Sequence, residues 1–417
     1  MNLLKPINLI NHRAWLYFFL VFVVSLVTSK AGMNILGPIL ALCSISTFVI
    51  YWKEIPSIAK IIFISCVSLY SIGLTGAYLT DASSDLSRFS QKNIFLLFLP
   101  FISLILSKKA NREISSYLFI AACTISSIAS IYNLVVVNDF NTSIRVHGFL
   151  EFSRHINALM LGVAFITLLL NQGLGNRLQK NILLLSLVLS VISLMLSGTR
   201  GGWLAFALMF TFISIIYLRR YIPHLILTVF IIAVGLNQLF PIQSEAIYQR
   251  ILSISNTTTN TSNTARIKMW RGGIEYLTFQ KEHDTTKFLF GSGMVSSDAN
   301  YHGFINSLSK EDASPFVNGD EINGGSDFHN AAIDLTIKSG VIYSALLFFG
   351  VMTIFSLSFK NNIRENDPVI SSVNAYFIAL FTLMPFYSLL QDYSALTITF
   401  SFSLILGKII EVSQNES

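Results

Sequence analysis

Hydropathy and charge together predict an all-α polytopic membrane protein with about twelve transmembrane helices. Of the 417 residues, 53% are hydrophobic and only 12% are charged, and the mean hydropathy is +0.62. A soluble domain carries roughly 25% charged residues, so half of the usual charge is missing. One long polar stretch, from Pro241 to Asp327, interrupts the hydrophobic segments. Estimates of domain number from length do not apply to such a chain.

The predicted spans follow from length, because a helix needs about twenty apolar residues to cross the roughly 30 Å hydrocarbon core. Three of the segments contain a proline (Pro38, Pro100 and Pro385), which neighbouring helices in a bundle can accommodate. The twelve segments are residues 14–29, 34–51, 59–78, 93–107, 115–136, 155–171, 181–197, 202–218, 222–240, 330–357, 371–390 and 394–410.

Lysine and arginine in the short loops predict the orientation, since cytoplasmic loops carry an excess of them. With a cytoplasmic N-terminus, fourteen of these cations fall inside: Lys5, Arg13, Lys53, Lys60, Lys108, Lys109, Arg112, Arg177, Lys180, Arg219, Arg220, Lys360, Arg364 and Lys408. Six fall in short outside loops: Lys30, Arg88, Lys92, Arg145, Arg154 and Arg200. Both termini are then cytoplasmic and the polar stretch lies outside. Topology does not require the six outside cations, so they need another explanation.

The polar stretch contains several distinct patterns. Residues 256–265 form a low-complexity polar linker. Arg266 and Trp270, four residues apart, share a face of a predicted amphipathic helix near the membrane surface. Phe290-Gly291-Ser292-Gly293 predicts a tight turn, and the Gly/Asn/Asp-rich residues 315–325 predict an irregular mobile loop that could gate a site. The apolar positions at helical spacing are Ile267, Trp270, Ile274 and Leu277.

His329 stands where this stretch ends and the next apolar segment begins. A histidine at a helix start is most often a capping or interfacial residue, but here Asp334 and Lys338 follow on one helical face. A charged pair in the first turns of a membrane helix is costly unless it faces protein or water. This end of the helix is therefore expected to line a polar cavity.

Arg200 stands alone at a predicted membrane edge, in Ser-Gly-Thr-Arg-Gly-Gly-Trp. A lone arginine there most often reaches back to the interface. The following Gly201 and Gly202 expose backbone N–H groups at a helix start, which suits a phosphate oxygen. One neighbouring outside loop adds Arg145, His147, Arg154 and His155. Together these residues predict an outward-facing anion site with an available histidine base.

The order of these elements resembles the O-antigen ligase family of Gram-negative bacteria. An Arg-His pair precedes a span, and Ser-Gly-Thr-Arg-Gly-Gly-Trp-Leu-Ala follows. The long outside region then contains Ala-Arg-x-x-x-Trp, Phe-Gly-Ser-Gly and His-Asn. The resemblance covers roughly residues 140–410, and the first four spans match only in hydropathy. Thr199 stands where many relatives have serine.

This resemblance implies a GT-C-like fold and a metal-independent glycosyltransferase without a cofactor. The enzyme would transfer O-antigen polysaccharide from undecaprenyl diphosphate to lipid A–core, at the periplasmic face of the inner membrane, in lipopolysaccharide biosynthesis. Nucleic acid is not an expected partner. The expected organisation is transmembrane helices 1–9 in residues 1–239, a periplasmic loop region with short helices in 240–329, and helices 10–12 with a cytoplasmic tail in 330–417. No outside segment contains an Asp-x-Asp motif or a His/Asp cluster suited to a divalent ion.

The resemblance also implies residue roles. His329 would be the base that takes the acceptor proton, with inversion at the anomeric carbon, and Arg200 and Arg266 would bind the diphosphate. Asn330 or Asp334 could orient the imidazole, although Asp334 could instead pair with Lys338. The expected substrate-binding residues are Arg154, His155, Arg145, Trp270, Asn330 and Gly201.

Other functions remain open at this stage. An O-antigen polymerase would use lipid-linked glycan as both donor and acceptor, and a protein O-oligosaccharyltransferase shares the Arg-Gly and His elements. A polysaccharide transporter or flippase would place polar residues near the bilayer midplane, often on broken helices in repeated halves. Here the isolated charges lie at predicted outside edges and no internal repeat is visible, which disfavours a transporter.

Overall fold

The computed structural model describes residues 13–80, 83–139, 144–173, 175–224, 226–227, 261–318, 321–365, 367–391 and 393–415, with isolated positions between 234 and 252. Most of the predicted ninth span, 222–240, and the first half of the predicted linker, 256–260, lie outside these ranges. The second half of the linker prediction, 261–265, is wrong, because these residues form the first turns of a helix that begins at Thr261. Within them the protein is helical apart from one two-stranded hairpin. The longer helices before residue 220 are α2 (Arg13–Thr28), α3 (Lys30–Ile50), α4 (Ser57–Tyr78), α5 (Ser83–Asn93), α6 (Phe95–Ile105), α7 (Lys109–Tyr132), α8 (Phe152–Asn171), α9 (Arg177–Leu196) and α10 (Arg200–Ile216).

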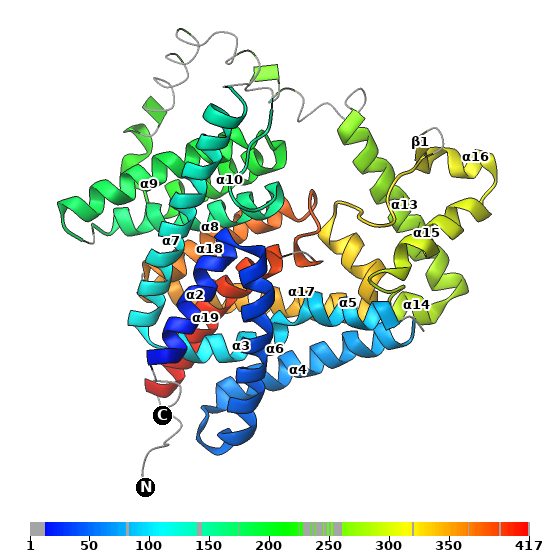
Figure 1. The fold of residues 1–417 in the computed structure, drawn as a ribbon, viewed down its shortest axis with the longest axis horizontal. Helices are drawn as coiled ribbons and strands as arrows, with labels where there is room; N and C mark the ends of the chain where they lie inside the picture. Colours follow the sequence, from blue (N-terminus) through cyan, green and yellow to red (C-terminus); the bar gives the residue numbers. More distant parts are fainter. Residues whose placement is uncertain are drawn as a thin grey trace.

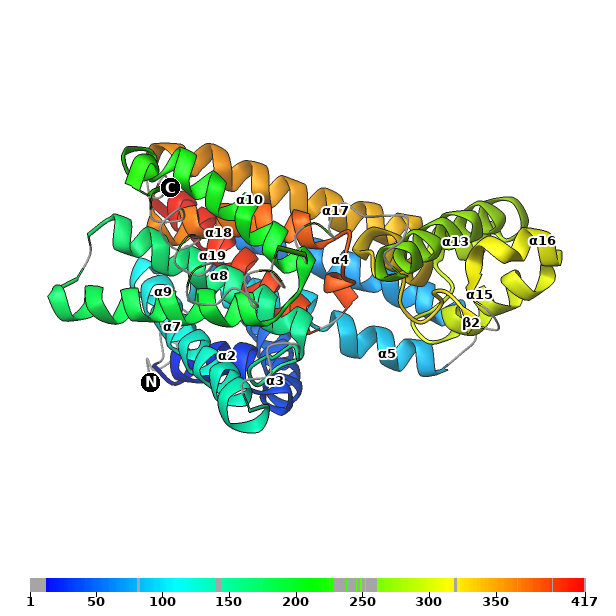
Figure 2. The ribbon, with the colours of Figure 1, turned by 90° about the horizontal axis from the view of Figure 1, so that it is seen from above.

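The second half of the chain builds a polar lobe and then returns to apolar helices. The lobe contains α13 (Thr261–His283), α14 (Thr285–Phe290), α15 (Ser296–Ser307), α16 (Lys310–Ala313) and the hairpin of β1 (Val317–Asn318) and β2 (Glu321–Ile322). The apolar helices are α17 (Ala331–Glu365), α18 (Pro368–Leu383) and α19 (Ser394–Asn415). Figure 1 shows the lobe beside the helical bundle, and Figure 2 shows α4, α5 and α17 reaching from the bundle towards it.

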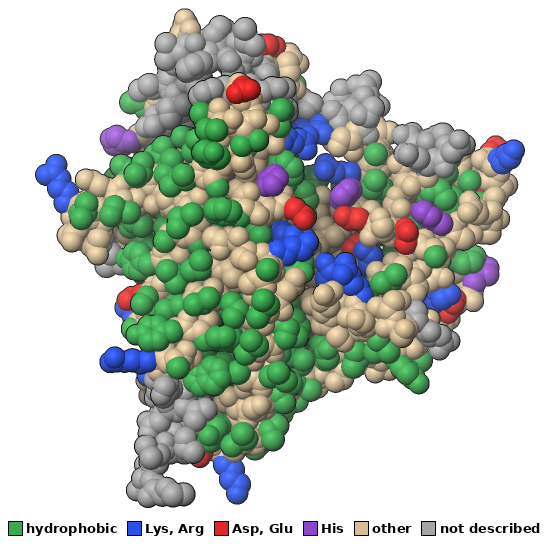
Figure 3. Space-filling model, in the orientation of Figure 1, with side chains coloured by type: hydrophobic (Ala, Val, Ile, Leu, Met, Phe, Trp, Pro, Cys, Tyr) green, Lys and Arg blue, Asp and Glu red, His purple; other side chains and the backbone are tan. Residues whose placement is uncertain are grey.

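The bundle is a polytopic membrane domain. Seven described helices are long and apolar enough to cross a membrane, namely α3, α4, α7, α8, α9, α17 and α19. Three shorter apolar helices, α2, α10 and α18, accompany them. Hydrophobic side chains cover much of the bundle surface, as Figure 3 shows, which is the pattern expected of helices that face lipid. On α3, for example, Ile35, Leu42 and Val49 are exposed at intervals of seven residues.

The predicted span 371–390 is wrong at its C-terminal end. α18 ends at Leu383, two residues before Pro385, whereas Pro38 and Pro100 lie inside α3 and α6. Proline has no N–H to donate to a helical hydrogen bond, and its ring clashes with the carbonyl one turn earlier. The chain therefore leaves the helix and forms a loop between α18 and α19 before α19 begins at Ser394. This loop lies at the candidate site described below.

The Phe-Gly-Ser-Gly turn docks on a break in α17. The break is at Gly340, whose backbone has φ +81° and ψ 164°. The N–H groups of Ser292 and Gly293 donate to the carbonyls of Ile337 (2.8 Å) and Lys338 (3.1 Å), which the break leaves available. The turn itself is confirmed, with Gly291 at φ +99° and Gly293 at φ +91°. The break divides α17 into a short first segment, 331–339, and a long apolar segment after it.

The predicted amphipathic helix forms as part of α13, and small residues on it are buried against protein. Ile267 and Ile274 are exposed, and the buried residues include Gly272, Gly273 and Tyr276. Gly273 lets α13 approach α17 closely, since a Cβ there would lie 2.5 Å from the Ile333 side chain. Close packing through these small residues therefore helps to determine how the helix lies.

The predicted mobile loop 315–325 contains the hairpin, so it is not wholly irregular. Val317 pairs with Ile322, and the Asn323 N–H donates to the Phe316 carbonyl at 2.9 Å. The Tyr301 hydroxyl donates to the Asn323 carbonyl at 3.1 Å. Phe316 and Tyr301 are buried in the small core of the lobe, so this segment is tied to the helices around it.

The Gly340 break provides a test of how the first segment of α17 is held. An alanine Cβ at Gly340 would lie 2.3 Å from the Leu289 carbonyl oxygen, in a backbone region that costs a residue other than glycine about 1–3 kcal/mol. Gly340→Ala should therefore lower the thermal unfolding temperature of the protein in detergent. Gly350→Ala in the same helix is the control, because no atom lies within 4 Å of its Cβ. Equal unfolding temperatures for the two variants would mean that the break is not needed.

Candidate active site

A polar pocket of about 560 Å³ lies between the bundle and the lobe. Its walls are α5, the start of α8, the α18–α19 loop, and the segment before α17 together with its first turns. Figure 3 shows charged side chains gathered in this hollow. The volume is in the range of small-molecule sites. The ionisable groups on the walls are Arg88, Lys92, Glu151, Arg154, Asp327, His329, Asp334, Lys338 and Tyr387.

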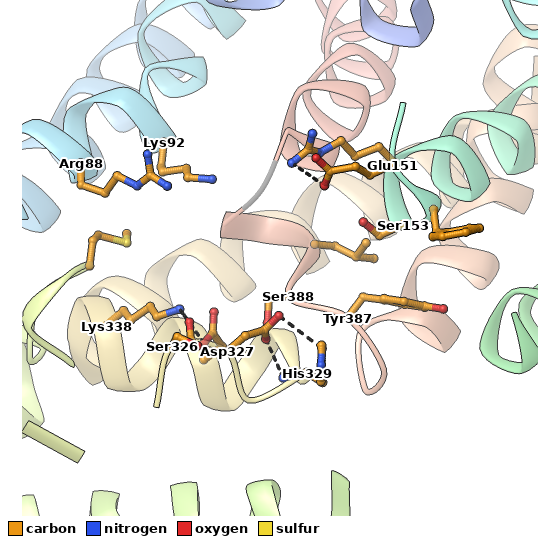
Figure 4. Close-up of a pocket in the computed structure, with 15 residues that line it drawn as sticks. Arg88, Lys92, Glu151, Ser153, Ser326, Asp327, His329, Lys338, Tyr387 and Ser388 are labelled. Atoms are coloured by element: carbon orange, nitrogen blue, oxygen red, sulfur yellow. Dashed lines mark hydrogen bonds and ion pairs between the residues drawn. The ribbon is translucent and has the colours of Figure 1, made fainter. Parts of the chain in front are cut away.

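His329 is held by Asp327 on one side of this pocket, as Figure 4 shows. Its Nδ1 lies 3.2 Å from Asp327 Oδ2, and its backbone N–H donates to Asp327 Oδ1 at 2.6 Å. The Ser388 hydroxyl donates to the same Oδ1 at 2.6 Å. His329 has φ +49°, which residues other than glycine seldom adopt. Such strain persists only where surrounding contacts impose it, and Asp327 supplies two of those contacts.

Asp327 is expected to remain ionised. Burial raises the pKa of its carboxyl, but the hydrogen bond and charge of His329 and the hydrogen bond from Ser388 lower it more, so the net pKa lies well below the usual range. A carboxylate beside Nδ1 favours the tautomer with its proton on Nδ1. That tautomer leaves Nε2 of His329 as a proton acceptor, which is what a general base requires.

Asn330 and Asp334, the two expected orienting residues, each hold another group. Asn330 caps α17, since its Oδ1 accepts the Ala332 N–H at 3.0 Å. Asp334 pairs with Lys338 at 2.8 Å, and the Lys338 ammonium also donates to the Ser326 carbonyl at 2.7 Å. The alternative expectation of an Asp334–Lys338 pair is therefore confirmed, and Asp327 is the orienting residue that the sequence interpretation missed.

The positive charges of three predicted arginines act on the pKa of the Tyr387 hydroxyl. Burial raises the pKa of Tyr387, while the positive charges of Arg266, Arg145 and Arg200 and a hydrogen bond with Thr199 lower it; the net shift is upward. The arginines come from α13, the segment before α8 and the start of α10, so the fold brings distant segments together. Tyr387 also lines the pocket that contains His329.

Phe386 packs against the same predicted residues. The Arg266 guanidinium lies 5.9 Å from the centre of its ring, and the Trp270 ring lies 6.5 Å from it, centre to centre. Arg266 and Trp270 do share a helical face, as predicted. Gly201 lies against the other side of this contact, because a Cβ there would be 3.3 Å from Phe386. Gly201 thus allows α10 to approach the α18–α19 loop.

The neighbours Arg154 and His155 face different environments. Arg154 lines the pocket, 3.3 Å from Glu151, with its guanidinium 4.6 Å from the centre of the Tyr393 ring. His155 is buried and does not line the pocket; its ring nitrogens lie 3.2 Å from the Ser126 hydroxyl and 2.9 Å from the Ser193 hydroxyl. Successive helical residues point about 100° apart, so an Arg-His pair need not act together.

The sequence interpretation left several pocket residues without a role. Arg88 and Lys92 were predicted only as outside cations, and Tyr387 and Ser388 fell inside a predicted span. Asp327 had a detectable signal: a carboxylate two residues before a helix-start histidine can accept that residue's backbone N–H. Across the described parts of the chain, no group of three or more His, Cys, Asp or Glu side chains could hold a metal ion.

Comparison with known proteins finds a similarity over part of the chain, less than half of its length. Residues 185–349 match the family model described as O-antigen ligase. The matched region contains Arg200, Arg266 and His329, whereas Arg145 and Tyr387 lie outside it. No curated protein matches the chain. The protein is therefore a multi-pass membrane protein whose residues 185–349 are similar to the O-antigen ligase family.

Proposed function

We propose that the protein is an O-antigen ligase, which transfers O-antigen polysaccharide from undecaprenyl diphosphate to lipid A–core. One observation carries this proposal: two adjacent residues of the α18–α19 loop join a base to a cluster of cations. Ser388 hydrogen-bonds the carboxylate that holds His329, and Tyr387 lies within the influence of Arg145, Arg200 and Arg266. A base beside a concentration of positive charge suits transfer from a donor with a diphosphate leaving group.

The arginines would stabilise the negative charge that develops on the leaving diphosphate. A guanidinium keeps its charge at any physiological pH and can bind two phosphate oxygens at once. Cations fixed in advance around a developing charge are often the largest contribution to catalysis. We propose Arg200 and Arg266 for this role, with Arg145 beside them, and we propose that the transfer proceeds without a metal ion.

His329 would act on the acceptor. The acceptor hydroxyl oxygen attacks the anomeric carbon of the donor, and its proton passes to Nε2 of His329. The bond from the anomeric carbon to the diphosphate oxygen breaks, and the electron pair leaves on that oxygen. A single displacement of this kind inverts the anomeric configuration. General-base help is typically worth about 10²–10⁴-fold in rate.

The remaining predicted residues take supporting roles in this proposal. Arg154 faces the pocket and can meet a substrate anion, whereas His155 is buried and would act only by holding α8 to its neighbours. Trp270 and Gly201 would shape the α18–α19 loop through Phe386. Asn330 would fix the start of α17.

The proposed setting is the inner membrane, with a GT-C-like arrangement of twelve spans and the pocket facing the periplasm. Two groups of contacts support this orientation, because residues predicted to lie on the same side of the membrane contact one another. Cations predicted to lie outside meet at Tyr393, where Lys30 and Lys92 each lie 5.4 Å from the ring centre. Residues predicted to lie inside meet at Glu411, 2.6 Å from Arg112 and 3.1 Å from Lys408.

Deleting the gene and examining lipopolysaccharide on a gel tests the proposed activity. A ligase deletion should leave unsubstituted lipid A–core while lipid-linked polymer accumulates, and the wild-type gene should restore the ladder. Core that carries a single repeat would instead identify a polymerase. Loss of all lipid-linked polymer from the outer leaflet would indicate a transporter.

If His329 is the base and Asp327 orients it, substituting His329 should lower the transfer rate more than substituting Asp327. With purified protein, His329→Ala should lower the transfer rate by about 10²–10⁴-fold, the usual value of a general base. Asp327→Asn should cost less, roughly 10–100-fold, because the base remains but loses its orientation. His302→Ala is a matched control: His302 lies 3.7 Å from Asp298, and its side chain is 42% exposed against 43% for His329. Similar rates for His302→Ala and His329→Ala would contradict the proposed base.

If Arg200 binds the diphosphate through two contacts, a positive charge alone at this position should not support transfer. Arg200→Lys should lose nearly as much transfer activity as Arg200→Ala, because an ammonium cannot form the paired contact of a guanidinium. The control is Arg271→Lys, an exposed position on α13. Full activity of Arg200→Lys in the transfer assay would show that Arg200 does not bind the diphosphate through two contacts.

A further inference from the structure

We propose that Arg88 and Lys92 on α5 form a subsite for an anionic group, phosphate or carboxylate, on the acceptor saccharide. This inference rests on the proposed ligase function and adds where the acceptor binds and what chemistry it must carry. Arg88 and Lys92 are four residues apart and so share one face of α5. Both line the pocket that contains His329. Figure 4 shows them across the pocket from Lys338, Asp327 and His329.

The acidic side chains of this pocket already have cationic partners. Glu151 lies 3.3 Å from Arg154, Asp334 lies 2.8 Å from Lys338, and Asp327 lies 3.2 Å from the imidazole of His329. The Arg88 guanidinium donates to a neutral group, the side-chain Oε1 of Gln91, at 3.0 Å. The Arg88 side chain is exposed towards the pocket, where an arriving anion can reach it.

The helix that carries the two cations is fixed at both ends. Near its start the buried Asp85 carboxylate accepts the N–H groups of Val295 and Ser296 and the hydroxyl of Thr80. At its end the side-chain Oδ1 of Asn93 accepts a hydrogen bond from the Tyr343 hydroxyl at 2.7 Å. α5 is therefore tied to both the lobe and α17. A cation pair on a fixed helix loses less freedom on binding an anion than one on a mobile loop.

The direction of the reaction assigns this wall to the acceptor. In a single displacement the attacking oxygen and the leaving oxygen lie on opposite sides of the anomeric carbon. The arginines that influence Tyr387 would hold the leaving diphosphate, and His329 must contact the attacking hydroxyl. The acceptor then extends away from the diphosphate, into the part of the pocket walled by α5. An anionic group on the acceptor would meet Arg88 and Lys92 there.

Steady-state kinetics with the full-length protein test this subsite. The donor is undecaprenyl diphosphate-linked O-antigen, and the acceptor is lipid A–core in native, dephosphorylated or carboxyl-reduced form. We expect Arg88→Gln and Lys92→Gln each to raise the acceptor KM about tenfold, the effect of one lost charge-assisted contact, with the donor KM as in wild type. Lys281→Gln, an exposed cation on α13, is the control and should change neither KM.

The modified acceptors distinguish the two anions. If phosphate is recognised, dephosphorylation should raise the wild-type acceptor KM, and the variants should then add no further increase. If carboxylate is recognised, only carboxyl reduction should have this effect. A raised donor KM in the variants would overturn the proposal, and so would a variant effect that both modified acceptors leave intact.

A binding measurement without donor separates this proposal from the proposed function. Native lipid A–core should bind the wild-type protein more tightly than Arg88→Gln, even if the wild-type protein transfers nothing to it. Absent transfer would contradict the ligase function alone. Equal binding by wild type and Arg88→Gln would overturn the subsite.

Discussion

The hydrogen bond from Ser388 to Asp327 is the contact on which the proposed site depends. It joins the α18–α19 loop to the carboxylate that holds His329 in an uncommon backbone conformation. The neighbouring Tyr387 extends from the same loop into the field of three arginines. The loop exists because α18 stops before Pro385. One proline-terminated helix therefore sets the spacing between the proposed base and the proposed diphosphate site.

A second constraint fixes the other wall of the pocket. The break at Gly340 frees two carbonyls of α17, and the N–H groups of Ser292 and Gly293 use them. Asp85 on α5 binds the N–H of Val295 just beyond that turn. The first segment of α17 and the cationic helix α5 are thus tied to one glycine-rich turn. Such cross-links keep polar groups satisfied where helices end near a membrane surface.

The sequence predicts the helical membrane class and the convergence of separate arginines near a histidine, because hydropathy, loop charge and local motifs carry those signals. It does not predict the orienting residue or the α5 wall. Asp327 lies outside the helical spacing used to relate Asp334 and Lys338. Arg88 reaches the pocket through the packing of α5 against α4, the lobe and α17. The predicted span 371–390 was too long because Pro385 was taken to lie inside a helix. Proline does lie inside two other helices of this chain, α3 and α6. The close contacts of α13 through Gly272 and Gly273 were not predicted, because a glycine gives no hydropathy signal for packing.

The position of the donor diphosphate tests the central claim most directly. An experimental structure of the full-length protein with bound undecaprenyl diphosphate would show it. We predict phosphate oxygens at the guanidinium groups of Arg200 and Arg266, beside Tyr387, with His329 free to meet an acceptor hydroxyl. A diphosphate bound instead to Arg88 and Lys92, with Arg200 and Arg266 unoccupied, would contradict the account by exchanging the donor and acceptor sides of the pocket.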